Sequence, residues 1–367
     1  IEQGFLVPYG EKLKKEVSVP VIVAARLNNA NLIESVVEDG KADMVAIGRG
    51  LIADEDLIIK IREKRYDDIK YCVACNQGCI DNVLKGEGIN CLENARSSYE
   101  DERNIVKTDE PQNVVVIGAG PAGLEAARVS ALRGHKVTLI EKEEALGGKM
   151  ATLAEPPEKE TFLLYRQYLL GQIEKLPVTV VRKEVKAASD IKEFAPDYVI
   201  VATGSRQTKP PIPGINGTNV VFAEDLLNKV VEPKDRIAVI GGGLVGTETA
   251  KYLGAMGKKV DIIEMMDAIA KDSGATFVGH VFKKLQEYNV GIHVNAKVQK
   301  ITDTQIKFND EVLDVDQVAI ASGYEPNTEI VDTLKKEHEN VLVIGDANSP
   351  RRILDATREA YLATYRL

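Results

Sequence analysis

Residues 114–141 read VVVIGAGPAGLEAARVSALRGHKVTLIE, and residues 237–264 read IAVIGGGLVGTETAKYLGAMGKKVDIIE. Both stretches fit G-x-G-x-x-G-x3-A-x6-G followed by a run that ends in Glu, and every matched position is offset by 123 residues, as from Gly118 to Gly241. A strand, a glycine-rich turn and a helix in this order predict the β-α-β unit that binds a dinucleotide. The sequence therefore predicts two dinucleotide-binding domains in one chain.

The glycines of this fingerprint have separate tasks. The first permits the tight turn after the strand, the second lets the backbone approach a pyrophosphate, and the third lets the helix pack closely on the strand. They are Gly118, Gly120 and Gly123 in the first copy and Gly241, Gly243 and Gly246 in the second. The acids that end the copies, Glu141 and Glu264, are placed to accept hydrogen bonds from a ribose diol. Two unrelated glycine-rich turns are the alternative, which the trailing Ala, Gly and acid of each copy disfavour.

All the cysteines of the chain lie upstream of the first fingerprint. Cys72, Cys75, Cys79 and Cys91 have the spacing C-x2-C-x3-C-x11-C, and no cysteine follows Cys91. Three thiolates close in sequence and one distant thiolate suit the four corners of a [4Fe–4S] cluster. Two alternatives are a structural zinc site, which more often uses two separated C-x2-C pairs, and unligated core cysteines. The place of this quartet just before a nucleotide-binding fingerprint suggests electron transfer.

Composition excludes several classes of function. The chain has 367 residues, a net charge of −9 and a pI of about 5.3. Nucleic acid is not an expected partner, because phosphate binding needs a basic surface. We expect no membrane span, because no uncharged apolar run reaches about 18 residues. Clustered cysteines and the lack of a signal-peptide pattern at the start, IEQGF, predict a reduced, cytoplasmic protein.

The first 71 residues predict two β-α units. Strands are expected at 21–24 and 44–47, with helices at 31–39 and about 54–64. Strands that alternate with helices indicate parallel pairing, and parallel sheets are normally buried on both faces. Two such strands cannot cover themselves, so this segment is expected to be the tail of a larger domain.

From the first fingerprint onward the chain resembles flavoprotein reductases with two dinucleotide domains. The resemblance rests on the double fingerprint, on Leu146-Gly147-Gly148, on the ATG segment in YVIVATG (198–204) and on the Gly-Asp pair in VLVIGDA (341–347). It implies FAD in the first copy and NAD(P)H in the second, with Ala202, Thr203 and Gly204 beside the flavin and Gly345 and Asp346 at its ribityl and phosphate groups. Glu264 favours NADH, because an acid there repels a 2′-phosphate, although Lys258, Lys259 and Lys271 keep NADPH as an alternative.

The whole assembly resembles the group of 2,4-dienoyl-CoA reductase, 2-enoate reductase and trimethylamine dehydrogenase. The motifs that carry this resemblance are CVACNQGC with the distant Cys91, VAIGRGLIAD (45–54) and PRRILDA (350–356). The family combines an FMN-carrying (β/α)8 barrel, a [4Fe–4S] cluster, and FAD and nicotinamide domains. The resemblance implies further FAD contacts at Ala122, Gly148, Lys149, Lys159 and Val185. It also implies an FMN phosphate site at the last two barrel turns, Ala25-Arg26 and Gly48-Arg49.

The expected fold is α/β, with two Rossmann-like three-layer domains arranged as in glutathione reductase. The expected domains are a barrel remnant (1–71), the cluster module and linker (72–110), an FAD domain (111–212 plus 321–367) and an inserted NAD(H) domain (213–320). Since only two barrel strands are present, the chain is expected to be a fragment that lacks the substrate barrel, and no catalytic residue is assigned.

The function implied is reduction of an activated C=C bond, in an enoate or enoyl-CoA, with electrons passing from NADH through FAD and the [4Fe–4S] cluster to FMN. An amine dehydrogenase that sends electrons outward is one alternative. A nucleotide-binding fragment without turnover is another. The expected partner is a small unsaturated molecule, and a homo-oligomer is possible.

Overall fold

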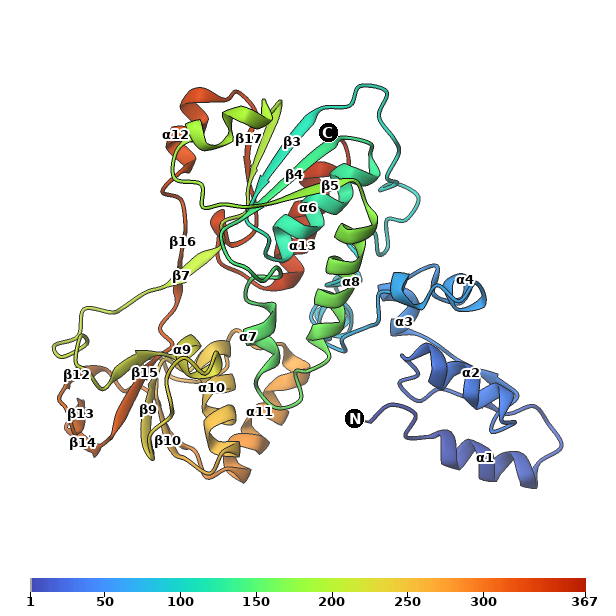
Figure 1. Ribbon diagram of the computed structural model, residues 1–367. Helices are drawn as coiled ribbons and strands as arrows, with labels where there is room; N and C mark the ends of the chain where they lie inside the picture. The colour runs from blue at the N-terminus through green and yellow to red at the C-terminus, as the bar shows by residue number, and fades with distance from the viewer. Residues whose placement is uncertain (1) are drawn as a thin grey trace.

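The computed structural model describes residues 2–367, and its N-terminal unit, residues 2–71, contains a two-stranded parallel sheet. Figure 1 shows this unit in blue beside helix α8. Its elements are α1 (Val7–Glu16), β1 (Ile22–Val23), α2 (Ala30–Glu38), β2 (Met44–Val45), α3 (Arg49–Ala53), α4 (Leu57–Arg62) and the 3-10 helix η1 (Tyr66–Asp68). Helix α4 begins later than the expected residue 54, because Asp54 has extended backbone (φ −143°, ψ 103°). The Asp54 carboxylate accepts hydrogen bonds from the backbone N–H groups of Asp56 and Lys70.

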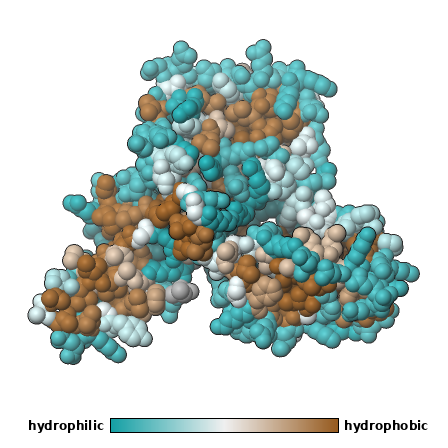
Figure 2. Space-filling model, turned by 180° about the vertical axis from the view of Figure 1, so that it is seen from behind, coloured by the Kyte–Doolittle hydropathy of each residue, from teal (hydrophilic) through white to brown (hydrophobic). Residues whose placement is uncertain are grey.

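The small sheet leaves large apolar side chains at the surface. Ile22 of β1 is 57% exposed and Met44 of β2 is 49% exposed. On the helices, Tyr9, Leu13 and Ile59 are also exposed. Figure 2 shows apolar side chains gathered on the surface of this unit, at the lower left. Strands of a parallel sheet are normally covered on both faces, so the exposure of these apolar side chains is unusual for an isolated folded domain.

The cysteine module, residues 72–112, is mostly irregular and contains one short helix, α5 (Ile80–Leu84). Its packing comes from the domain that follows. Val73 and Leu92 are buried in the main core of that domain. The Thr161 hydroxyl donates a hydrogen bond of 3.1 Å to the carbonyl oxygen of Val73. The module is therefore anchored to the first dinucleotide domain by apolar burial and by a hydrogen bond from a side chain to its backbone.

The first dinucleotide domain has a five-stranded parallel sheet with the order β17-β6-β3-β4-β5. Helix α6 is buried along nearly its whole length, and it packs between α8 and α13. The elements are β3 (Asn113–Ile117), α6 (Pro121–Leu132), β4 (Lys136–Glu141), α7 (Met150–Ala154), α8 (Phe162–Lys175), β5 (Val178–Arg182), η2 (Ala188–Phe194), β6 (Tyr198–Val201), α12 (Val331–Glu337), β17 (Val341–Val343), η3 (Gly345–Ala347) and α13 (Ile353–Thr364).

The second dinucleotide domain repeats this sheet, with the order β8-β15-β9-β10-β11. Strands β9, β10, β11 and β15 correspond in order to β3, β4, β5 and β6. The elements are β8 (Val220–Phe222), α9 (Ala223–Leu227), β9 (Arg236–Ile240), α10 (Leu244–Ala255), β10 (Lys259–Ile263), α11 (Ala275–Glu287), β11 (Gly291–His293), β12 (Val298–Ile301), β13 (Gln305–Phe308), β14 (Glu311–Asp314) and β15 (Gln317–Ile320). Strands β12, β13 and β14 form an antiparallel sheet of their own.

The chain crosses between the two dinucleotide domains twice, and the two crossings pair with each other. Strand β7 (Ser205–Gln207) runs out of the first domain, and β16 (Tyr324–Pro326) returns to it. They form a two-stranded antiparallel ribbon with Tyr324 opposite Gln207, visible in Figure 1 between the two lobes. The second domain is thus an insertion held by a paired connection.

The turn between β3 and α6 makes a direct stability prediction. A Cβ atom on Gly123 would lie 1.8 Å from the carbonyl oxygen of Gly118, whereas a Cβ on Gly171, in the middle of α8, would meet nothing within 4 Å. We expect Gly123→Ala to lower the free energy of unfolding by about 1–3 kcal/mol through overpacking. Gly171→Ala, the matched control, should raise it by about 0.5–1 kcal/mol because alanine loses less backbone entropy in a helix. Urea unfolding followed by circular dichroism measures both, and equal midpoints would refute the assignment.

Candidate functional site

The first fingerprint forms a tight turn against strand β6. Gly118 has φ +100°, and a Cβ there would lie 2.3 Å from the carbonyl oxygen of Ala202. Ala202, Thr203 and Gly204 therefore follow β6 directly beside the turn. By contrast, a Cβ on Gly120 would meet nothing within 4 Å. The N-terminus of α6, which has no side-chain capping bond, thus opens onto free space at the glycine expected to face a pyrophosphate.

The Gly-Asp pair near the C-terminus reaches the same helix. A Cβ on Gly345 would lie 2.8 Å from the Cβ of Ala122 in α6, so the two chain segments touch. The Asp346 carboxylate accepts hydrogen bonds from the Ser205 hydroxyl (2.9 Å) and from the backbone N–H of Arg351 (3.1 Å). The structure thus brings residues from three distant parts of the sequence to the start of α6.

The acids that end the two copies act alike. Glu141 accepts hydrogen bonds from the backbone N–H groups of Ala119 (2.7 Å) and Glu143 (3.0 Å). Glu264 accepts the equivalent bonds from Gly242 (2.6 Å) and Met266 (2.7 Å). A carboxylate has about four acceptor positions, so each acid retains capacity for a ribose diol after it has fixed its own turn.

The remaining residues expected to contact FAD have different neighbours from one another. A Cβ on Gly148 would lie 2.9 Å from the Cα of Gly120, which places the double glycine against the fingerprint. Lys149 forms an ion pair of 2.7 Å with Glu224, and its ammonium lies 4.0 Å from the ring centroid of Tyr324. Lys159 pairs with Glu248 of α10 at 3.2 Å. In the structure these two lysines therefore bridge the two dinucleotide domains.

Val185 packs against the strands that lead into the first fingerprint and into Glu141. It is buried in an apolar cluster with Val115, Ile117 and Ile140, whose side chains come from β3 and β4.

The second fingerprint repeats the geometry of the first with one addition. A Cβ on Gly246 would lie 1.9 Å from the carbonyl oxygen of Gly241, and Gly241 has φ +103°. However, a Cβ on Gly243 would find the Asp272 carboxylate 3.1 Å away, and the backbone N–H of Leu244 donates to that carboxylate at 2.9 Å. In the second copy an acidic side chain therefore lies at the helix N-terminus.

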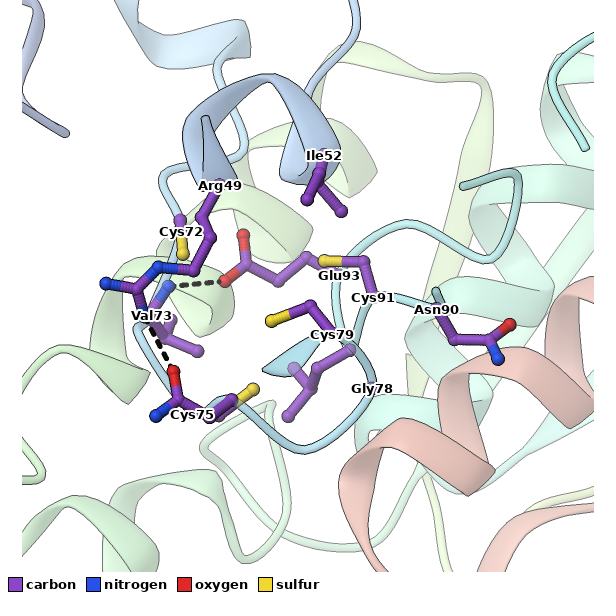
Figure 3. Close-up of a pocket in the computed structure, with 12 residues that line it drawn as sticks. Arg49, Ile52, Cys72, Val73, Cys75, Gly78, Cys79, Asn90, Cys91 and Glu93 are labelled. Atoms are coloured by element: carbon purple, nitrogen blue, oxygen red, sulfur yellow. Dashed lines mark hydrogen bonds between the residues drawn. The ribbon is translucent and has the colours of Figure 1, made fainter. Parts of the chain in front are cut away.

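The four cysteines line one small pocket. Figure 3 shows their sulfur atoms facing a common space, with Arg49 and Glu93 at its edge. Glu93 is 2% exposed, and its Oε1 accepts a hydrogen bond of 2.9 Å from the backbone N–H of Val73. Its Oε2 has no hydrogen-bond partner within residues 2–367. A buried polar atom left without a partner is costly, so a group bound in the pocket would explain it.

Burial controls the charge of this pocket. It raises the pKa of the Cys72 thiol to about 11 and that of Cys75 to about 12, and it raises the pKa of Glu93 to about 8. The bare thiols of Cys72 and Cys75 are therefore neutral at pH 7. Cations that bind them would displace their protons, since a coordinating thiol is deprotonated.

The spread of the quartet bears on which metal group fits. In the part of the chain that the structure describes, no three His, Cys, Asp or Glu side chains are close enough to share one metal ion. Four ligands of one zinc ion converge at about 2.3 Å from it. Four thiolates that each bind a different iron at the corners of a cluster stand farther apart. Four cysteine thiols around one pocket are the donor set that an iron–sulfur cluster uses.

A second, larger pocket adjoins the first. Its lining includes all four residues expected at an FMN phosphate: Ala25, Arg26, Gly48 and Arg49. A Cβ on Gly48 would meet nothing within 4 Å, which leaves its backbone open to a ligand. Arg49 and Cys72 line both pockets. We call the pocket lined by the four cysteines the cysteine pocket, and the pocket lined by Ala25, Arg26, Gly48 and Arg49 the phosphate-type pocket. The two pockets thus share a wall.

The cysteine module also touches the second domain. Asp81, which is 1% exposed, accepts hydrogen bonds from the backbone N–H (3.0 Å) and the hydroxyl (2.9 Å) of Thr276 at the start of α11. Asn76 donates to the same hydroxyl at 3.2 Å. The quartet therefore lies where the N-terminal unit and both dinucleotide domains meet.

Several residues of the site were not found from the sequence. Glu359 accepts from the backbone N–H of Gly345 at 2.9 Å, and Arg166 donates to the carbonyl oxygen of Leu146. Neither has a sequence signal, because each acts across a tertiary contact. Asp272 does have one: it stands 123 residues after Lys149, so extending the repeat by eight residues would have marked it.

Two protein families match this chain. The pyridine nucleotide-disulphide oxidoreductase family matches residues 78–160 and 112–359. The NADH:flavin oxidoreductase / NADH oxidase family matches residues 4–68.

Individual relatives cover the chain almost completely. Bilirubin reductase of Mediterraneibacter gnavus is 36% identical over 98% of this chain and 57% of its own length. Cinnamate reductase of Clostridium sporogenes is 34% identical over 98% of this chain and 55% of its own length. Among solved structures, a 2-naphthoyl-CoA reductase superposes with a TM-score of 0.96 at 28% identity, over all of this chain and 57% of that one. The chain thus spans somewhat more than half the length of these relatives.

These findings confirm the family resemblance and the α/β fold with two Rossmann-like domains. They also confirm the flavin and nicotinamide cofactors and the [4Fe–4S] cluster as those of this family. Within residues 2–367, no helix has both the length and the apolar character needed to cross a bilayer.

The cysteine pocket predicts which substitutions remove the cluster. Cys79→Ala takes away one corner ligand, so iron should fall from about four atoms per chain to a small fraction of that. Val83→Ala, on the exposed face of neighbouring helix α5, should keep its iron and serves as the control. Elemental analysis and visible absorbance measure the outcome. Retention of full iron by Cys79→Ala, or one zinc per chain in the parent protein, would contradict the assignment.

The open space at Gly120 predicts a separate effect on the flavin. Gly120 has φ −72° and ψ −175°, which alanine adopts readily, and its Cβ would clash with nothing. Gly120→Ala should therefore change the free energy of unfolding of the flavin-free protein by no more than about 1 kcal/mol. The added methyl group occupies the approach to the pyrophosphate, so FAD content should fall severalfold. Flavin absorbance per chain tests this, and undiminished FAD would place the pyrophosphate elsewhere.

Proposed function

The chain belongs to the pyridine nucleotide-disulphide oxidoreductase family, and we propose that it serves an NADH-dependent reductase acting on an activated C=C bond. The substrate would be a small enoate or enoyl thioester. When bound, FAD would accept a hydride, a [4Fe–4S] cluster would carry single electrons, and FMN would reduce the substrate. The protein positions these groups, and its own residues supply the binding surfaces described above.

One observation carries this proposal: the candidate cofactor pockets are contiguous. Arg49 and Cys72 line both the cysteine pocket and the phosphate-type pocket. On the other side, Cys75 packs against the core of the first dinucleotide domain, with Val73 and Leu92. A group held by the quartet would thus have the candidate FMN phosphate pocket on one side and the core of the FAD domain on the other. This arrangement supports electron transfer rather than a purely structural metal.

Arg49 is suited to the wall between the two pockets. Its Nη1 donates a hydrogen bond of 2.6 Å to Oδ1 of Asn76, which fixes the guanidinium beside Cys72 and Cys75. The planar guanidinium has further donors, which can bind a phosphate from the other pocket. We propose that Arg49 holds the FMN phosphate together with the backbone at Gly48, while Ala25 and Arg26 supply the second turn.

The surroundings of Glu264 favour NADH over NADPH. Met265 and Met266 follow it, 71% and 49% exposed, where a 2′-phosphate would need a basic residue. Lys259 begins β10 and Lys258 precedes it, at the edge opposite Glu264. The five-residue strand places them about 16 Å away. Lys258 and Lys259 are therefore too far from Glu264 to contact a ribose bound there, and Lys271 is paired with Asp267.

The enoate and thioester substrates are proposed from the relatives. One relative is named a cinnamate reductase and one structural neighbour a 2-naphthoyl-CoA reductase. The apolar surface around Ile22 and Met44 supports the expectation that further β-α units cover the N-terminal sheet. We propose that these units complete an FMN barrel and carry the groups that touch the substrate, in a cytoplasmic enzyme.

Anaerobic titration with NADH tests the proposal. The flavin absorbance should bleach, and an EPR signal of a reduced cluster should appear as bleaching proceeds. In Cys79→Ala the flavin should bleach without that signal. Bleaching without a cluster signal in the parent protein would refute electron transfer to the quartet. An outward-running amine dehydrogenase would instead bleach with an amine and not with NADH.

A further inference from the structure

The two dinucleotide domains differ at the helix N-terminus that would face a pyrophosphate. In the second domain, Oδ2 of Asp272 accepts a hydrogen bond of 2.9 Å from the backbone N–H of Leu244, the first residue of α10. The same oxygen would lie 3.1 Å from a Cβ placed on Gly243. Gly243 is the glycine where the fingerprint allows close approach of a pyrophosphate. The chain therefore brings its own anion to that place.

The loops that follow the two acids can be compared position by position. In the first copy the backbone N–H of Gly147 donates to the carbonyl oxygen of Ala119 at 2.9 Å. In the second, Ala270 donates to Gly242 at 2.7 Å. Both bonds join residues that match at the offset of 123, and both donors have positive φ, +113° for Gly147 and +58° for Ala270. The loops therefore fold over their fingerprints in the same way.

Within this shared geometry, two matched positions change the chemistry. Asp272 corresponds to Lys149, whose ammonium pairs with Glu224 instead of meeting the helix. Leu244 corresponds to Pro121, which has no backbone N–H and so cannot hold a carboxylate there. The first copy thus leaves its helix N-terminus open, whereas the second has both the donor and the acid that fills it.

A helix N-terminus favours one anion at a time. The Asp272 carboxylate satisfies a donor that a dinucleotide pyrophosphate would use, and two negative groups there repel each other. The Asp272 side chain is exposed, so it can rotate into water when a ligand enters. The loop backbone is held at both ends, by Glu264 on Met266 and by Asp81 on Thr276. Displacement is therefore expected to involve the side chain and not the whole loop.

We propose that Asp272 sets the affinity of the second dinucleotide site by competing with the pyrophosphate for the α10 N-terminus. It makes that site one from which NADH and NAD⁺ exchange readily. The first site has no such competitor and retains its nucleotide as a prosthetic group. This inference rests on the proposed function, in which the second site takes the nicotinamide substrate. The apparent dissociation constant equals the intrinsic constant divided by the fraction of protein in which the α10 N-terminus is free of Asp272. Removal of the acid brings that fraction to one and lowers the apparent constant to the intrinsic value.

Equilibrium binding of NAD⁺ to the oxidised, FAD-loaded protein tests the proposal without turnover. The variants are Asp272→Ala, which removes the competitor, Asp272→Lys, which installs the residue of the first copy, and Asp272→Asn, which keeps the size but loses the charge. Asp235→Ala is the control, because Asp235 precedes β9 at the amino ends of the strands, opposite the fingerprint turn. Among the ion pairs of the described chain, Asp235 pairs only with Lys258. Adenosine, which has no phosphate, serves as a competing ligand. Calorimetry gives the dissociation constants, and thermal melting monitors folding.

We expect Asp272→Ala and Asp272→Lys to lower the NAD⁺ dissociation constant by about three- to tenfold, the size of one charged hydrogen bond at a helix end. Asp272→Asn should lower it less, while Asp235→Ala and the inhibition constant of adenosine stay unchanged. If Asp272→Ala does not fold, an unchanged dissociation constant in Asp272→Asn overturns the proposal.

Other outcomes separate the inference from the proposed function. An unchanged or raised dissociation constant in Asp272→Ala, with NAD⁺ still bound by the parent protein, overturns the role of Asp272 and leaves the proposed function standing. Parallel changes for NAD⁺ and adenosine indicate a general loosening of the site and also overturn it. Failure of parent and variants to bind NAD⁺, with no bleaching by NADH, overturns both.

Discussion

The architecture depends on one close contact, made twice: a helix pressed onto the turn that precedes it. The third fingerprint glycine stands where a Cβ would lie 1.8 Å from the carbonyl oxygen of Gly118 in the first domain, and 1.9 Å from that of Gly241 in the second. No other residue permits this approach. It directs the N-termini of α6 and α10 beyond the carboxyl ends of the strands, where the N–H groups of the first helical turn favour an anion.

The cysteine module shows how a short irregular segment can organise larger parts. It has little secondary structure, yet Val73 and Leu92 are buried in the first dinucleotide core and Asp81 caps a helix of the second. Its pocket shares Arg49 and Cys72 with the pocket of the N-terminal unit. The quartet is therefore placed by contacts to three neighbours, and those same neighbours carry the candidate sites for the other redox groups.

Much of this arrangement was predictable, because it rests on local geometry. The fingerprints, their strands and the ATG and Gly-Asp turns are short patterns whose backbone demands can be read directly from glycine spacing. Lys159 illustrates what could not be read: it reaches Glu248, 89 residues later in the chain, through a domain contact. The break between α3 and α4 is similar, since Asp54 is drawn into hydrogen bonds with Lys70 that no helical periodicity reveals.

The sequence by itself determined the duplicated dinucleotide fold and the family, and it predicted the cysteine quartet as a ligand set, because each depends on residue types at fixed spacings. Only the tertiary structure decided that the cysteine pocket adjoins the phosphate-type pocket through Arg49, and that Asp272 lies on the α10 N-terminus. The physical reason is the separation along the chain of the residues that determine each feature. Spacing dictates what a turn or a helix end can bind, whereas which side chain arrives there depends on loops and domains whose packing is set by contacts far apart in the chain.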